Sequence, residues 1–126
     1  MDTAINLKSV LVIDDEQTIL NLISKSLTRN GYAVDSAENG EKGIEKIESN
    51  DYSLILTDLI MPGLSGEQVL QYLRSIQKKP TPVVGMSGTP WLLEKIDFDG
   101  VLAKPFSLKE LLTITKKFVE KIKPAT

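Results

Sequence analysis

The sequence predicts an α/β fold, a doubly wound sheet of five parallel strands with helices on both faces. Three observations predict it: short apolar runs recur along the chain, helical apolar spacing separates them, and each run ends in something polar. The 126 residues are 41% apolar, which suffices for one core without disulfides. We expect a single domain over residues 1–126, with its core in about 8–122 and a frayed tail or linker start in 123–126.

The predicted strands follow from the apolar runs. Residues 10–13 read Val-Leu-Val-Ile, a continuous apolar run typical of a parallel strand covered on both faces. The remaining predicted strands are residues 32–37, 54–56, 82–86 and 101–103.

Helices are predicted between these strands. The first carries Ile19, Leu20, Ile23 and Leu27 at helical spacing and ends at Asn30-Gly31. The second covers residues 40–47, and the last covers 108–122 with Leu108 at the start of its inner stripe. The inner stripe of the third consists of Val69, Leu70, Leu73 and Ile76. Pro90 and the turn at 97–100 leave about two turns at most for a shortened fourth helix.

Composition excludes several functions. The chain has 15 basic and 17 acidic residues, so no strong field favours nucleic acid or anionic lipid, and we expect no direct binding to either. Cysteine and histidine are absent, which excludes thiol and histidine chemistry within this chain. The start lacks the features of a signal peptide, and no apolar run reaches the ~18 residues of a membrane span. We therefore expect a cytoplasmic protein.

Polar side chains that could carry chemistry stand where the predicted strands end. Asp14 and Asp15 follow the first strand, Asp58 the third, Ser87 the fourth and Lys104 the fifth. Open parallel sheets bind ligands at this edge. Clustered carboxylates remain ionised together only if a cation neutralises them, and oxygen ligands suit Mg²⁺, or Mn²⁺, better than zinc. The sequence thus predicts a divalent metal site.

Each of these residues also has a structural explanation. Asp14 and Asp15 precede a helix, where carboxylates cap the backbone and favour the helix dipole. Asp58 suits the turn before Pro62-Gly63, Ser87 suits a cap or turn, and Lys104 on its own suits a surface lysine. Only the joint placement of the residues favours a site.

Four sequence blocks resemble the response-regulator receiver family. They are VLVIDDE at residues 10–16, LTDLIMPG at 56–63 with Gly66 beyond it, MSG at 86–88 and AKPF at 103–106. The resemblance covers nearly the whole chain, in order, and implies the flavodoxin-like strand order 2-1-3-4-5.

The resemblance also implies roles for the acidic residues. Asp58 would be the phosphoacceptor, a carboxylate nucleophile that forms an aspartyl phosphate. Asp15, Asp58 and the backbone carbonyl of Ile60 would bind Mg²⁺ directly, while Asp14 would act largely through water.

Ser87 and Lys104 would hold the phosphoryl oxygens, and the Lys104-Pro105 bond would be cis. The donor would be a phosphohistidine on a sensor histidine kinase or a histidine phosphotransfer protein, and the downstream effector is unknown. The chain would not be an enzyme apart from catalysing its own Mg²⁺-dependent phosphorylation and dephosphorylation.

Two features depart from the family pattern. Val101 stands where members carry Tyr or Phe, so we expect no ring-rotation switch and instead predict movement of the loop at 87–91. The fourth helix is short. Trp91 and Phe106 are predicted to be packing residues, with contact to a partner protein as the alternative for Trp91.

Two alternative functions remain open. A dehalogenase-like phosphatase also uses Asp, Mg²⁺, Ser or Thr, and Lys, but its second Asp two residues after the nucleophile is missing here. A receiver-like module that no longer accepts phosphate is suggested by Val101 and the short helix.

Overall fold

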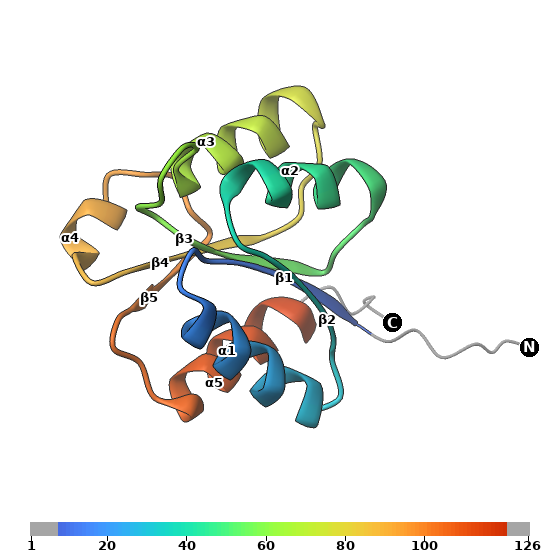
Figure 1. Ribbon diagram of the computed structural model, residues 1–126, viewed down its shortest axis with the longest axis vertical. Coiled ribbons are helices and arrows are strands. Elements are labelled where there is room, and N and C mark those ends of the chain that lie inside the picture. The colour runs from blue at the N-terminus through green and yellow to red at the C-terminus, as the bar shows by residue number, and fades with distance from the viewer. Residues whose placement is uncertain (1–7, 121–126) are drawn as a thin grey trace, which may run out of the picture.

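The computed structural model describes residues 8–120, which form a parallel sheet between two layers of helices (Figure 1). The strands are β1 (Ser9–Ile13), β2 (Ala33–Ala37), β3 (Leu54–Asp58), β4 (Val83–Ser87) and β5 (Gly100–Ala103). Their order is β2-β1-β3-β4-β5 and every pairing is parallel, which confirms the predicted architecture.

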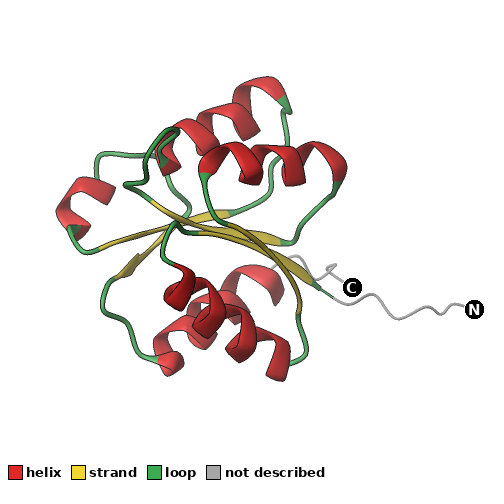
Figure 2. Ribbon diagram, viewed as in Figure 1, coloured by secondary structure: helices red, strands yellow, loops and turns green. Residues whose placement is uncertain are grey.

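Helices cover both faces of the sheet (Figure 2). One layer contains α1 (Gln17–Arg29) and α5 (Leu108–Val119), and the other contains α2 (Gly40–Ser49) and α3 (Gly66–Gln71). The short α4 (Pro90–Leu93) lies between β4 and β5, at the end of the sheet away from β2. No helix in the described part of the chain combines the length and apolar character needed to cross a bilayer.

Two buried clusters form the core, one under each helix layer, and the central strands contribute alternate residues to both. Val10, Val12 and Leu56 pack toward α1 and α5, whereas Leu11 and Ile13 pack toward α2 and α3. This alternation explains why the central strands read as continuous apolar runs, since both faces of the sheet are covered.

Local signals in the sequence position the helices. Asn39 caps α2 by accepting a hydrogen bond from the amide of Lys42, and Ser65 and Ser107 form capping boxes at the starts of α3 and α5. Gly31, at φ +92°, follows the end of α1 in a left-handed conformation that glycine adopts without strain.

The third helix differs from the prediction. After α3 the backbone continues as the π-helix η1 (Tyr72–Ile76), and Ile76 is 66% exposed rather than buried. The wider turn of a π-helix changes the angular spacing of side chains, so the α-helical stripe does not extend to Ile76.

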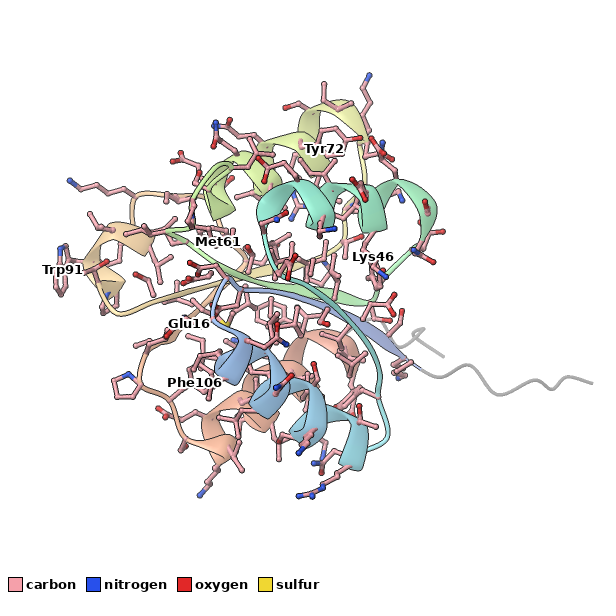
Figure 3. The ribbon with its side chains drawn as sticks, viewed as in Figure 1. Glu16, Lys46, Met61, Tyr72, Trp91 and Phe106 are labelled. Carbon is pink, nitrogen blue, oxygen red and sulfur yellow. The ribbon has the colours of Figure 1, made fainter. Side chains whose placement is uncertain are left out.

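Two further burial predictions are wrong. Leu108 is 47% exposed; it is the first residue of α5, and the buried stripe of that helix begins at Leu111. Trp91 is 63% exposed and projects outward from α4 (Figure 3), whereas Phe106 packs against the core as expected. Residues 121 and 122, included in the predicted last helix, and the predicted tail at 123–126 lie outside the described residues.

Candidate phosphoacceptor and metal site

Register in the sheet brings the acidic residues together. Ile13 pairs with Thr57, so the residues that follow them, Asp14 and Asp58, reach the carboxyl edge of the sheet side by side. One carboxylate oxygen from each of Asp14, Asp15 and Asp58 lies within 4.8 Å of the others. The predicted convergence of the three carboxylates is therefore confirmed.

The cluster fits a divalent metal ion. Its donors are oxygens alone, and the exposed Asp15 stands on the solvent side of two buried carboxylates, Asp14 and Asp58. Solvent therefore reaches the cluster at Asp15, and Mg²⁺ retains water ligands in most protein sites. Ile60, whose backbone carbonyl is the fourth predicted ligand, lies two residues beyond Asp58 in the loop before α3. Its ligand role stays a prediction.

Asp14 is bonded to the turn before α1 and to the lysine that follows β5. Its side chain is fully buried; Oδ1 accepts a hydrogen bond from the amide of Glu16 at 2.9 Å and Oδ2 binds Nζ of Lys104 at 2.8 Å. The N-cap residue of α1 is Glu16, and its side chain makes no capping bond. Neither Asp14 nor Asp15 is therefore the N-cap residue of α1, although helix capping is the structural explanation that the sequence offers for them.

Lys104 follows β5 directly, and its ammonium group lies among the acidic side chains of the cluster. Its ammonium lies 3.3 Å from Oδ1 of Asp58 and 3.8 Å from Oε1 of the exposed Glu16. Burial acts to lower the pKa of Lys104, but the hydrogen bond to Asp14 and the charges of Asp58 and Asp14 raise it above its ordinary value. Lys104 is therefore protonated at the site.

Asp58 is held through one of its two carboxylate oxygens. Oδ1 accepts a hydrogen bond from the amide of Leu59 at 3.1 Å and lies near Lys104, while none of the residues 8–120 donates a hydrogen bond to Oδ2. The oxygen Oδ2 is thus left for a metal ion or an electrophile. Burial, and then the charge of Asp14, raises the pKa of Asp58 to about 6 despite the opposing effect of Lys104.

The close approach of the α3 backbone to the end of β3 fixes the position of Asp58. Gly66, at the start of α3, is buried so close to β3 that a Cβ atom there would lie 2.3 Å from the carbonyl oxygen of Asp58. Its amide also donates a hydrogen bond to the carbonyl of Leu59 at 2.9 Å. Gly66 therefore brings α3 close to the strand end that carries the carboxylate.

Ser87 ends β4 at the same edge and is 4% exposed. Within residues 8–120, its hydroxyl makes hydrogen bonds to Thr89 and none to Asp58 or Lys104. Sequence reasoning missed Thr89, for which the only available signal was a second hydroxyl residue two positions after Ser87. The Lys104-Pro105 bond is cis, as the resemblance implied.

The raised pKa of Asp58 makes a prediction about stability. Because the folded state holds this proton up to about pH 6 and the unfolded chain releases it near 3.8, ionisation of Asp58 destabilises the fold as pH rises through that window. Asp58→Asn removes the effect. In chelator, the variant's free energy of unfolding relative to wild type should therefore increase by roughly 2 kcal/mol between pH 4 and pH 7.

Urea unfolding at both pH values tests this. The exposed Asp97, which lies outside the cluster, provides the matched Asp-to-Asn control Asp97→Asn. A difference between Asp58→Asn and wild type that stays constant between the two pH values would contradict the raised pKa.

Comparison with known proteins agrees with this geometry. Residues 10–116 match the response regulator receiver domain family. The transcriptional regulatory protein ResD of Bacillus subtilis (strain 168) is 35% identical over 121 residues, covering 92% of this chain and 50% of ResD. The transcriptional regulatory protein HprR of Escherichia coli (strain K12) is 32% identical over 108 residues, covering 82% of this chain and 48% of HprR. The chain thus spans about half the length of the curated relatives it matches.

Solved structures show the same fold. The Francisella response regulator 1452 receiver domain has a TM-score of 0.84 and 31% identity, with 92% of this chain and 99% of that chain covered. TrrA from Thermotoga maritima, solved in complex with Mg²⁺-BeF, has a TM-score of 0.80 and 34% identity, with 89% and 99% covered. Response regulators of this family accept phosphoryl groups, interact with histidine kinases and act on downstream targets. By its sequence, its strand order and its acidic edge, the chain belongs to the response regulator receiver domain family of two-component systems.

Proposed function

We propose that this receiver accepts a phosphoryl group on Asp58 and that Mg²⁺ is the metal ion at its acidic edge. The observation that carries the proposal is the arrangement around Asp58. One oxygen is held by the amide of Leu59 and the ammonium of Lys104, while the other receives no hydrogen bond from residues 8–120. A carboxylate fixed at one oxygen is oriented for attack by the other.

In the proposed reaction, an oxygen of Asp58 forms a bond to phosphorus as the bond between phosphorus and the donor's imidazole nitrogen breaks. The imidazole keeps the electron pair of that bond. Lys104 supplies positive charge beside the reacting carboxylate, and Ser87 would donate a hydrogen bond to a phosphoryl oxygen once its hydroxyl turns toward it. When bound by Asp15, Asp58 and the carbonyl of Ile60, with Asp14 acting through water, Mg²⁺ would neutralise charge on the transferring group.

The donor that we propose is a phosphohistidine of a sensor histidine kinase or a histidine phosphotransfer protein. The chain itself contains no histidine, so the donor has to be another protein or another segment. Residues 8–122 would form the receiver unit, in the cytoplasm, and its only catalysis would be that of its own phosphorylation and dephosphorylation.

Beryllofluoride, which mimics a phosphoryl group, tests the function directly. We expect wild type to bind it in the presence of Mg²⁺ and not in chelator, and we expect Asp58→Asn not to bind it at all. Calorimetric titration measures this without a donor protein. Binding that persists in Asp58→Asn would contradict the assignment of Asp58, and no binding by wild type would favour a receiver-like module that no longer accepts phosphate.

Metal binding gives a separate prediction on stability. Millimolar Mg²⁺ should stabilise wild type by roughly 1–3 kcal/mol, because the ion binds the folded cluster and not the unfolded chain. Asp15→Asn should gain much less from Mg²⁺, and without metal it should be as stable as wild type or more so, since one repelling carboxylate is gone.

Thermal unfolding with Mg²⁺ and with chelator compares the two proteins, and Asp97→Asn again serves as the control that should respond like wild type. If the melting temperature of wild type does not respond to Mg²⁺, the cluster is not a metal site.

A further inference from the structure

The loop after β4 contains a hydrogen-bonded pair that the proposed function leaves unexplained. The hydroxyl oxygen of Ser87 accepts a hydrogen bond from the amide of Thr89 at 2.9 Å, and it lies 2.9 Å from the hydroxyl oxygen of Thr89. Ser87 is 4% exposed, so water does not readily replace these partners. In the unphosphorylated protein, therefore, Thr89 satisfies the hydroxyl of Ser87.

Thr89 does not use its side chain in the way that its position predicts. It is the N-cap residue of α4, where a threonine hydroxyl usually accepts a hydrogen bond from an amide in the first turn. No such bond is present, and the hydroxyl points back to Ser87 instead. The hydroxyl of Thr89 can therefore be removed without removing a helix cap.

The Ser87 hydroxyl cannot donate its proton to Thr89 and to a phosphoryl oxygen at the same time. A serine hydroxyl has one proton to donate, and the amide of Thr89 already occupies one of its two acceptor positions. Within residues 8–120 the Thr89 hydroxyl is the only acceptor offered to the Ser87 proton, and Ser87 is buried, so in the resting state Ser87 donates this proton to Thr89, which is only partly buried and can give its own proton to water. A phosphoryl oxygen is an acceptor only, so Ser87 has to give the same proton to it. The hydrogen bond to Thr89 has to be broken or reversed when this happens.

We propose that Thr89 is a positioning residue that holds Ser87 in the unphosphorylated state, so that a phosphoryl group on Asp58 has to compete with Thr89 for the Ser87 hydroxyl. The inference rests on the proposed function, since it needs a phosphoryl group at Asp58. The proposal also gives a cause for the predicted movement of the loop at 87–91. When Ser87 is released, Thr89, the N-cap residue of α4, loses its side-chain partner and can move. Trp91, exposed two residues further on, would report that release.

The test compares two substitutions at Thr89. Thr89→Val keeps the branched shape and removes the hydroxyl, whereas Thr89→Ser keeps the hydroxyl. Losing one neutral hydrogen bond from the resting state only should strengthen beryllofluoride binding about fivefold in Thr89→Val. Thr89→Ser should bind as wild type does.

A double-mutant cycle shows whether Thr89 acts through Ser87. In a Ser87→Ala background, Thr89→Val should change beryllofluoride affinity by less than about twofold, because no hydroxyl remains to be held. All titrations contain Mg²⁺ and are followed by Trp91 fluorescence and by calorimetry, so that a variant that alters only the fluorescence is recognised.

Several outcomes would overturn the proposal. Weaker binding by Thr89→Val would show that Thr89 donates to Ser87 in the active state, and unchanged binding would show that it has no role. An effect of Thr89→Val that persists in the Ser87→Ala background, or that Thr89→Ser shares, would assign it to the loop's shape. If wild type itself fails to bind beryllofluoride, the proposed function fails, and with it this inference.

Discussion

Asp58→Asn is expected to abolish phosphorylation completely. The substitution keeps the size of the side chain but replaces the carboxylate whose one oxygen is held by Leu59 and Lys104 and whose other oxygen receives no hydrogen bond from residues 8–120. An amide is a poor nucleophile, and it also removes one of the three clustered charges that would hold a metal ion. Both losses act on the same step, so no residual reaction at this position is expected.

Intact-mass measurement after incubation with a small acyl-phosphate donor and Mg²⁺ records the result. Wild type should gain the mass of one phosphoryl group, and Asp97→Asn should gain the same mass because Asp97 lies outside the cluster. The neighbouring carboxylates provide a further check, since Asp14 and Asp15 remain in the variant. An adduct that survives in Asp58→Asn would show that one of them, or another residue, is the acceptor.

Gly66→Ala is expected to be among the most destabilising single substitutions in the chain. The added methyl group would meet the carbonyl oxygen of Asp58 at 2.3 Å and Cα of Leu59 at 3.1 Å. Both atoms belong to the backbone, so relief requires moving α3 away from β3 and not a rotation of a side chain. We expect a loss of about 3 kcal/mol in the free energy of unfolding, and weaker binding of Mg²⁺ as the strand end shifts.

Gly88→Ala is the matched control for this substitution. Gly88 lies at the same edge of the sheet, after β4, and a Cβ atom there would meet nothing within 4 Å. It should be neutral or slightly stabilising, since alanine reduces the entropy of the unfolded chain. Urea unfolding in chelator separates the two outcomes; equal stability of the two variants would mean that the close approach of α3 to Asp58 is not present in solution.

The sequence predicted the parts of the site that depend on sheet topology. Residues that follow parallel strands meet at one edge whatever the loops between them do, so the positions of Asp14, Asp58 and Lys104 could be inferred from strand ends alone. The ion pair between Lys104 and Asp14 could not, because it depends on side-chain geometry across β3 and β4, the two strands that separate β1 from β5. For the same reason the sequence assigned Lys104 only to the phosphoryl group.

Local backbone geometry accounts for the remaining differences. The contact of Ser87 with Thr89 depends on the angles of a two-residue loop, which apolar periodicity does not report. Ile76 satisfies the spacing of an α-helix, but the backbone there forms a π-helix. Trp91 was predicted to pack on general grounds of size, yet an α4 of only four residues gives a large ring little surface to cover.

The central claim is that Asp58 is the phosphoacceptor of a metal-dependent site, and peptide mapping of the phosphorylated protein tests it most directly. Wild type is treated with the acyl-phosphate donor in Mg²⁺ or in chelator, digested and analysed for the site of modification. We expect the phosphoryl group on the peptide containing Asp58, in the Mg²⁺ sample alone. A phosphoryl group found on any other peptide, or formed equally well in chelator, would contradict the claim.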